Sequence, residues 1–394
     1  MSVPFVGTPS SSNTIERRAG YDVWLLAATL ALCICGAIFV WTSSAAHSWR
    51  MAGGDSATIF WSHIGRLGWG LVCMVVLSFV DYHVLNNRTA RAAIALALAL
   101  LVAVLFVPQP SGATAHRWIY IRGFSFQPAE LGKFALINYL ACRFGNNFGD
   151  PFSLDLRKIY VGSLLISIFI IGLILVEPNL SMTALVLGTA ALLFFLSGIR
   201  LKPLLILAGA SAVPLSLAAW LTPYMHTRLT AYVEGIVDPL RAGYHVKQSL
   251  IGIGQGGLTG LGLGGSTQKH FFLPEPYKDF IFSIVGEEAG LIGAILLLAG
   301  FGLFLARAWK IARNAPDGYG YYLASGICCA VAISLTINVG VTLGLLPATG
   351  QPLPFISYGG SSLMMTLGAV GVLLNVSKQS QRRGESPHQP LQFR

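Results

Sequence analysis

Ten stretches of about twenty mostly apolar residues follow one another along this chain and restrict its fold more than any other feature. A helix needs about 20 apolar residues to cross a bilayer, so we interpret each stretch as a membrane-spanning helix. They lie at 22–42, 59–80, 90–107, 128–145, 159–176, 179–199, 203–222, 279–306, 320–346 and 355–377. The sequence therefore predicts an all-α polytopic membrane protein with ten transmembrane helices.

The composition agrees with this fold class. Hydrophobic residues make up 54% of the chain and charged residues only 11%, whereas about a quarter of a soluble domain is charged. A net charge of +10 in so apolar a chain is more typical of cytoplasmic helix flanks than of nucleic-acid binding, so no nucleic acid is expected as a partner. The six cysteines lie in apolar runs without metal-ligand or disulfide spacing and are expected to be packing residues.

Basic residues are divided unequally between the two sides of the predicted helices. With a cytoplasmic N-terminus, sixteen fall on inner segments and three, Arg50, Arg117 and Arg122, on short outer loops. The inner ones are Arg17, Arg18, Arg88, Arg91, Arg143, Arg157, Lys158, Arg200, Lys202, Arg307, Lys310, Arg313, Lys378, Arg382, Arg383 and Arg394. This bias predicts that both termini are cytoplasmic. One long outer loop then remains, at 223–278 between helices 7 and 8, and its aromatic and apolar residues favour a functional role.

One membrane domain, 21–377, is expected between two polar cytoplasmic ends. The leader 1–20 and the tail 378–394 are both expected to be disordered. The first apolar stretch lacks a small-residue cleavage site, so we do not expect a removable signal peptide. We find no internal repeat of the kind that many secondary transporters contain.

Polar residues gather at the outer ends of the predicted helices, first around Arg117 and Gln127. Glu130 would lie in the first turn of a helix, near the positive end of its dipole, and Lys133 three residues later would share its face. A capped helix with an internal ion pair explains the local pattern best. A charged pair facing a cavity is the alternative, because ionisable groups at membrane depth are costly.

The end of the long loop and the following helix carry two further clusters. Lys269 and Glu275 belong to the loop, and Asp279 directly precedes an apolar helical run, where an N-cap is the simplest interpretation. Glu287 and Glu288 follow about 12 Å further along that helix. A gating or packing pair and a substrate-facing pair are equally compatible with this position.

Prolines and glycines interrupt the chain before the last predicted helix, at 346–362. Such a segment cannot be a continuous helix, and non-helical backbone at membrane depth must be buried in protein or line a wet cavity. Its candidate residues are Ser357 and Ser361 for substrate binding and Pro354, Gly359 and Gly360 for structure or gating. A separate glycine-rich run, 252–265, lacks the setting of a nucleotide motif and is expected to be a mobile loop.

Together these segments resemble the SEDS family (shape, elongation, division and sporulation). The matching stretches, in family order, are 117–119, 126–133, 248–250 with the glycine-rich run, 273–275, 279–282, 287–288 and 354–362. The resemblance covers about residues 20–377. One departure is Asn179, which stands where the family usually has aspartate and weakens any role for an acid there.

The resemblance implies a peptidoglycan glycosyltransferase that polymerises lipid II on the outer face of the bacterial cytoplasmic membrane. The donor sugar would invert at its anomeric carbon, and undecaprenyl pyrophosphate would leave. A class B penicillin-binding protein and other divisome proteins are the implied partners. Gln268-Lys269 and the start at Asp22 to Leu26 are more similar to the division branch of the family than to the elongation branch, which implies a septal location.

By the same resemblance Asp279 is the catalytic base. Free aspartate has a pKa of about 3.9, and partial burial would raise it. Arg117, Lys133, Lys269 or a divalent cation, Mg or Mn, could assist the leaving pyrophosphate; we favour Lys133 paired with Glu130. No organic cofactor is expected. The residues expected to contact substrate are Arg117, Gln127, Glu130, Lys133, Lys269, Glu275, Ser357 and Ser361.

Other functions remain compatible with the sequence. A lipid II flippase could use the same polar cavity, an elongation-type polymerase would share the chemistry, and a scaffold could recruit the transpeptidase. A scaffold predicts that Asp279 and Glu130 are freely replaceable. Polymer formation in detergent separates the enzyme from the flippase, because detergent removes any vectorial role.

Overall fold

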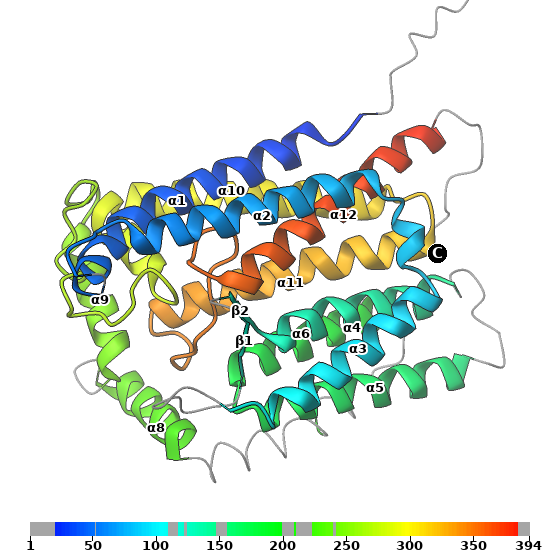
Figure 1. The fold of residues 1–394 in the computed structure, drawn as a ribbon, viewed down its shortest axis with the longest axis horizontal. Helices are drawn as coiled ribbons and strands as arrows, with labels where there is room; N and C mark the ends of the chain where they lie inside the picture. Colours follow the sequence, from blue (N-terminus) through cyan, green and yellow to red (C-terminus); the bar gives the residue numbers. More distant parts are fainter. Residues whose placement is uncertain are drawn as a thin grey trace, which may run out of the picture.

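The computed structural model describes residues 20–51, 53–108, 117–121, 124–146, 156–198, 209, 223–238 and 242–384. These ranges are almost entirely helical, and the long helices lie side by side in a bundle (Figure 1). The elements are α1 (Val23–Met51), α2 (Thr58–Phe79), the short 3-10 helix η1 (Tyr82–Leu85), α3 (Arg88–Val104), β1 (Ile119–Ile121), β2 (Phe124–Phe126), α4 (Pro128–Gly145), α5 (Leu156–Val176), α6 (Leu180–Leu196), α8 (Pro223–Val237), α9 (Tyr244–Gly256), α10 (Ile281–Arg313), α11 (Gly318–Thr342) and α12 (Gly360–Gly384).

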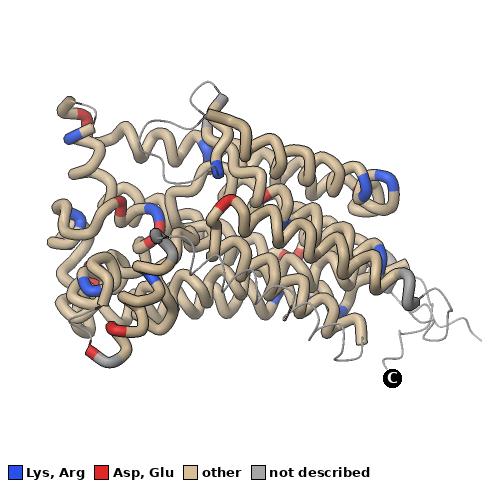
Figure 2. Tube along the Cα trace, turned by 90° about the horizontal axis from the view of Figure 1, so that it is seen from below, with Lys and Arg blue, Asp and Glu red and all other residues tan. Residues whose placement is uncertain are grey.

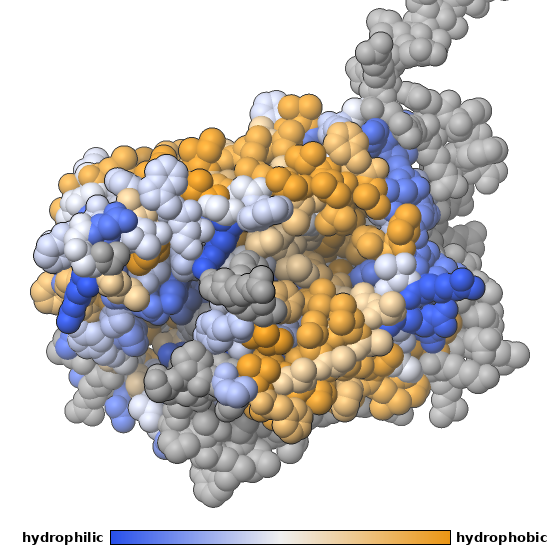
Figure 3. Space-filling model, viewed as in Figure 1, coloured by the Kyte–Doolittle hydropathy of each residue, from blue (hydrophilic) through white to orange (hydrophobic). Residues whose placement is uncertain are grey.

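Nine of the ten predicted spans coincide with helices of this bundle, which confirms the fold class. The seventh, 203–222, lies outside the described residues apart from residue 209. Six described helices are long and apolar enough to cross a membrane, namely α1, α2, α5, α10, α11 and α12. Large apolar side chains are exposed along their outer faces, and they form a hydrophobic belt between two hydrophilic ends (Figure 3). A lipid bilayer is the environment that suits such a belt.

The two ends of the bundle differ in what they carry. One, which we name the terminal end, holds the start of α1 and the end of α12. The other, the loop end, holds α8 and α9, and the β1–β2 hairpin lies inward of them (Figure 1). Charged residues lie at both ends of the bundle, and a further group of both signs lies between them (Figure 2). At the terminal end Arg307 forms a 2.6 Å ion pair with Asp22, which joins α10 to the segment before α1.

Helix α12 continues past the expected end of the last span, through residues 378–384. Lys378 stacks over the ring of Tyr21, and Gln381 accepts a hydrogen bond from the backbone of Gly20. These contacts explain why part of the expected disordered tail is helical. The remaining tail and the leader before residue 20 lie outside the described residues.

The glycine-rich run is not the mobile loop that its composition suggested. Its first residues belong to α9, and a Cβ on Gly256 or Gly260 would overlap the backbone of α10. The run also pairs with α10 through backbone hydrogen bonds, from Leu261 N–H to the Glu287 carbonyl and from Leu291 N–H to the Gly257 carbonyl. The glycines therefore permit close backbone packing. Sequence composition alone did not distinguish this from flexibility.

Helix α10 differs from its prediction in length and in regularity. It extends to Arg313 rather than 306, and Gly290 within it has φ 65°, which breaks the helical geometry. That conformation favours glycine. The break exposes backbone groups of α10 to the glycine-rich run, so the two segments complete each other's hydrogen bonds.

Alanine substitutions at two glycines of α9 test this packing. Gly256→Ala places a methyl group on the backbone of Gly286, whereas Gly254→Ala meets nothing within 4 Å. We expect Gly256→Ala to destabilise the protein by about 1–3 kcal/mol. Gly254→Ala should be neutral or more stable by up to about 1 kcal/mol. Thermal unfolding of the detergent-purified protein measures both, and equal melting temperatures would contradict the close packing.

Candidate active site

Asp279 lies in the turn that leads into α10, at the loop end. It does not cap the helix, because the N-cap position is Phe280 and no side chain caps it. The buried amide of Asn338 on α11 donates to the Asp279 carbonyl at 2.8 Å and to the Gln351 carbonyl at 2.8 Å. A Cβ placed on Gly350 would lie 3.3 Å from the Asp279 carboxylate. Asn338 therefore ties the backbone of Asp279 to α11 and to the segment at Gly350-Gln351.

The surroundings make Asp279 a stronger base than free aspartate. Burial is the main cause of a pKa raised to about 6, and the negative charge of Glu275 adds to it. Lys278, Arg228 and Arg117 act in the opposite direction. The carboxyl group thus titrates close to neutral pH, although three cations are near enough to stabilise its charge.

Two arginines from distant parts of the chain act on this carboxylate. Arg117 donates to the backbone carbonyls of Glu177 at 3.1 Å and Pro178 at 2.5 Å. Arg228 on α8 donates to the carbonyl of Ala348 at 3.0 Å. Arg117 was expected from the sequence but Arg228 was not, because nothing in the sequence of the long loop brings α8 towards Asp279.

A cavity of about 350 Å³ opens beside this group of charges. Residues of α8, α9 and the end of α11 line it, including Arg228, His245 and Leu343. The ring of His245 stacks on that of Phe280 with 5.9 Å between centroids, and Phe280 directly follows Asp279. The cavity is largely apolar, and Asp279 does not line it; His245 and Phe280 connect its wall to the acid.

Glu177 is a second buried carboxyl group in this region. It accepts no hydrogen bond from the described residues, and burial raises its pKa to about 8 although Arg117 lowers it. Asn179, the departure from the family pattern, caps α6 by accepting from Met182 N–H at 3.4 Å. An asparagine serves this capping purpose as well as an aspartate does.

Helix α2 brings a further polar group that the sequence analysis missed. The Arg66 guanidinium lies 4.5 Å from the Tyr358 ring centre. His63 is buried, and its ring nitrogens have no hydrogen-bond partner within the described part of the chain. Tyr358 is bonded through its N–H to the Tyr277 carbonyl at 2.9 Å. An arginine inside an apolar span was the available signal.

The predicted ion pair on α4 is present. Lys133 Nζ lies 2.6 Å from Glu130 Oε2, and both side chains are buried. Just before α4, the Gln127 N–H donates to the Ser361 hydroxyl at 3.2 Å. The pair neutralises its own charge inside the bundle, and Gln127 and Ser361 connect the start of α4 with that of α12.

The segment before α12 is non-helical, as predicted. The Ser357 hydroxyl accepts from the Leu353 N–H at 2.8 Å, so it serves the local turn. Phe355 packs between α10 side chains, with its ring 5.1 Å from that of Phe304. Pro354 lies within this turn, and Gly359-Gly360 end the segment at α12; a Cβ on Gly360 would lie 3.7 Å from the Arg66 guanidinium.

Glu287 and Glu288 hold the glycine-rich segment in place rather than facing an open cavity. Glu287 accepts from the Ser266 hydroxyl at 2.5 Å and from the Thr267 N–H at 2.7 Å. Lys269 forms a buried 3.1 Å ion pair with Glu288. We name these five residues the anchor cluster. By contrast, Glu275 pairs with Lys278 at 2.6 Å on the surface.

No three His, Cys, Asp or Glu side chains cluster as metal ligands anywhere in the ranges that the structure describes. The divalent cation of the sequence analysis therefore stays a prediction.

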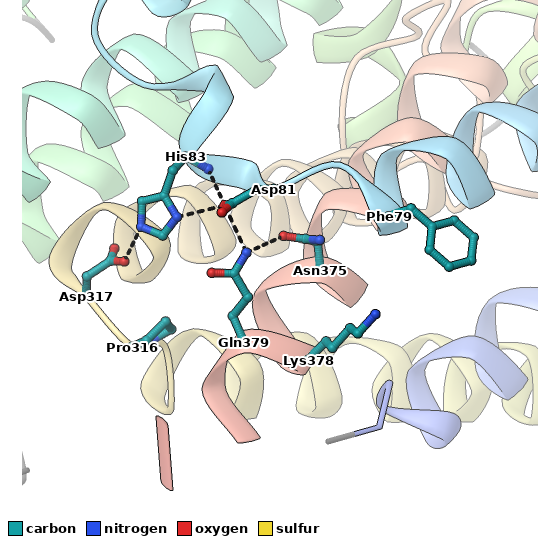
Figure 4. Close-up of a pocket in the computed structure, with 8 residues that line it drawn as sticks. All are labelled: Phe79, Asp81, His83, Pro316, Asp317, Asn375, Lys378 and Gln379. Carbon is teal, nitrogen blue, oxygen red and sulfur yellow. Dashed lines mark hydrogen bonds and ion pairs between the residues drawn. The ribbon is translucent and has the colours of Figure 1, made fainter. Parts of the chain in front are cut away.

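A larger cavity, about 480 Å³, lies at the terminal end and is not part of this site. Figure 4 shows His83 between Asp81 and Asp317, with ring nitrogens 2.8 Å from each carboxylate, and Gln379 bonded to Asp81 and Asn375. The carboxylates of this cavity are thus engaged in joining η1 to the start of α11 and the end of α12. We assign it a structural role.

The fold and site define a polytopic membrane protein with a fixed, weakly acidic carboxyl group at one end of its bundle. Residues 23–382 match the family model FTSW_RODA_SPOVE, described as cell cycle protein. The chain belongs to this family. It is 38% identical over 369 residues to Stage V sporulation protein E of Bacillus subtilis (strain 168), covering 92% of this chain and 99% of that protein.

Further relatives and solved structures agree. The chain is 37% identical over 364 residues to the probable peptidoglycan glycosyltransferase FtsW of Coxiella burnetii, covering 92% of this chain and 97% of the relative. A chain from a peptidoglycan synthase complex superposes with TM-score 0.71 at 28% identity, covering 91% and 98%. The rod shape determining protein RodA of Thermus thermophilus superposes with TM-score 0.67 at 27% identity, covering 91% and 97%.

Two lysine substitutions separate the anchor cluster from the surface pair. Lys269→Met leaves Glu288 as an uncompensated buried charge and should cost about 3–5 kcal/mol of stability. Lys278→Met removes one partner of an exposed pair and should change stability by less than about 1 kcal/mol. Thermal unfolding in detergent compares them. A Lys269→Met protein as stable as Lys278→Met would show that the cluster does not hold the segment.

Proposed function

We propose that this chain is a peptidoglycan glycosyltransferase that polymerises lipid II, with Asp279 as its general base. The observation that carries the proposal is the Asp279 carboxyl group, which has a pKa of about 6 and is acted on by two arginines, one of which lines an apolar cavity. The names of relatives, probable peptidoglycan glycosyltransferase FtsW, support the same activity.

The reaction needs one proton transfer and one displacement. The Asp279 carboxylate takes the proton of the acceptor GlcNAc 4-hydroxyl as that oxygen attacks the anomeric carbon of the donor MurNAc. The bond from this carbon to the pyrophosphate oxygen breaks, and undecaprenyl pyrophosphate leaves with the electron pair. A single displacement inverts the anomeric carbon without a covalent intermediate. Its base must be oriented and partly deprotonated at neutral pH, which the fixed position and pKa of Asp279 provide.

The leaving pyrophosphate gathers negative charge, which cations stabilise. Arg117 and Arg228 are held by backbone carbonyls near Asp279, so they can meet this charge without rearranging. Lys133, favoured from sequence, has its charge balanced by Glu130 within the bundle. We therefore propose that the two arginines stabilise the leaving pyrophosphate and that the Lys133–Glu130 pair positions α4.

The orientation in the membrane follows from the charges. Seven of the sixteen inner basic residues of the sequence analysis lie at or near the terminal end within the described residues: Arg88, Arg91, Arg143, Arg307, Lys310, Arg313 and Lys378. By the positive-inside rule this end faces the cytoplasm. Asp279 then lies on the outer side of the cytoplasmic membrane, where lipid II is polymerised. A class B penicillin-binding protein is the proposed partner, in line with the likeness to a chain of a peptidoglycan synthase complex. We propose a septal location beside other divisome proteins, supported by the division-type similarities of the sequence.

Asp279→Asn tests the proposed base. The amide keeps the size of the side chain but cannot accept the proton, so polymerisation should fall by about 10²–10⁴-fold. The measurement is glycan polymer formed from purified lipid II by the protein with its partner in detergent. Asp55→Asn, at an exposed loop-end carboxylate outside the site, is the matched control and should retain activity. Wild-type polymer formation by a folded Asp279→Asn protein would overturn the assignment.

The pH profile of polymerisation gives an independent test. Because Asp279 must be deprotonated to act, and burial raises its pKa to about 6, activity should rise with pH and reach half its maximum near pH 6. Below that value kcat/KM should fall about tenfold per pH unit. Initial rates between pH 4.5 and 8, with folding checked at each pH, measure the profile. A rate that does not change over this pH range would contradict a catalytic base with a raised pKa.

A further inference from the structure

A third cavity lies at the terminal end, far along the bundle from Asp279. Its volume is about 320 Å³, and it opens between the start of α3 and the end of α4. The polar residues that line it are Asn87, Arg91, Tyr139, Cys142, Arg143 and Asn146. Two guanidinium groups and no carboxylate are among its lining residues, in contrast to the cavity of Figure 4 with Asp81 and Asp317.

A frame of hydrogen bonds fixes the walls of this cavity. The Asn87 N–H donates to the Cys142 sulfur at 3.3 Å, and the Asn146 amide donates to Asn87 Oδ1 at 3.1 Å. The Arg91 Nε–H donates to the Asn87 carbonyl at 3.4 Å. The start of α3 and the end of α4 are thus bonded to each other, so the cavity is a built feature rather than a gap between loose ends.

Tyr139 is the observation that points to a ligand. Only 8% of this side chain is exposed, and it lines the cavity with the charges of Arg91 and Arg143 both acting on its hydroxyl. That hydroxyl has no hydrogen-bond partner within the part of the chain that the structure describes. A buried phenol that lines the same cavity as two guanidinium groups can donate to an anion that the two cations attract.

The position of the cavity restricts which anion can bind there. Arg91 lies one turn inside the start of α3, and Arg143 lies in the last turn of α4. The end of α4 lies against the start of α11, one of the helices long enough to cross a membrane. Phospholipid headgroups lie at the level of such helix ends. The start of α3 adds the positive end of its dipole. Basic pockets between transmembrane helices on the cytoplasmic side bind anionic lipid headgroups.

We propose that this cavity binds the phosphate of an anionic phospholipid from the leaflet that the terminal end faces. The phosphate oxygens would accept hydrogen bonds from Arg91, Arg143 and the Tyr139 hydroxyl. The lipid would join α3 to α4, the helix that carries the Glu130–Lys133 pair. The site is separate from the proposed catalytic site, and its test does not depend on polymerase activity.

Thermal unfolding of the full-length protein in a non-ionic detergent tests the proposal. Phosphatidylglycerol should raise the melting temperature, and phosphatidylcholine with the same acyl chains should raise it less. Arg91→Gln should raise about tenfold the phosphatidylglycerol concentration that gives half of the stabilisation. This is the loss expected for one charge-assisted hydrogen bond. Arg88→Gln is the matched control, because Arg88 is exposed on the same helix turn but does not line the cavity.

Tyr139→Phe provides a variant that keeps the fold and removes only the hydroxyl. It should also weaken the phosphatidylglycerol effect, by severalfold. Equal shifts for the two lipids, or equal responses of Arg91→Gln and Arg88→Gln, would overturn the proposal. If inorganic phosphate stabilises the protein as much as phosphatidylglycerol does, the ligand is a free anion, and the lipid assignment is overturned.

Discussion

The anchor cluster is the interaction on which the position of the candidate active site depends. Glu287 and Glu288 are buried in α10, where an unpaired carboxylate would be costly, and they are satisfied by Ser266, Thr267 and Lys269. The stretch of chain from Lys269 to the start of α10 includes Asp279, and the backbone carbonyl of Asp279 accepts a hydrogen bond from Asn338. The glutamates therefore act on the chemistry indirectly, by fixing the short piece of chain that presents the acid.

This arrangement explains how one carboxyl group becomes basic enough to act. Burial raises the pKa of Asp279, and Lys278, followed by Arg228 and Arg117, limits the rise to about 6. Without the cations a carboxyl group so placed would remain protonated at neutral pH, as burial favours for Glu177, whose pKa is about 8. Arg117 lowers the pKa of both acids, whereas Arg228 lowers only that of Asp279. This difference in charge environment is consistent with Asp279 as the base and with Glu177 as a protonated residue that takes no part in the reaction.

The sequence predicted the helices and most of the polar clusters because these depend on local pattern. Apolar length predicted nine observed helices, and the spacing of Glu130 and Lys133 predicted their ion pair. It did not predict that Arg228 acts on Asp279, since this electrostatic interaction joins α8 to a segment about fifty residues away and depends on how the long loop folds. The glycine-rich run was misjudged for a related reason: glycine permits both flexibility and close packing, and only the partner backbone of α10 decides between them.

The two ends of the bundle use buried charge in different ways, and this difference separates their tasks. At the terminal end the carboxylates of Asp81 and Asp317 are bridged by His83, which joins the ends of three helices and leaves little charge for chemistry. At the loop end the carboxylate of Asp279 has cations near it, but its fixed hydrogen bond is made by its backbone rather than its side chain. A carboxylate already bridged to a histidine would have to break that contact to accept a proton. Asp279 can do so in place, which is why we assign the reaction to the loop end although the larger cavity lies at the other.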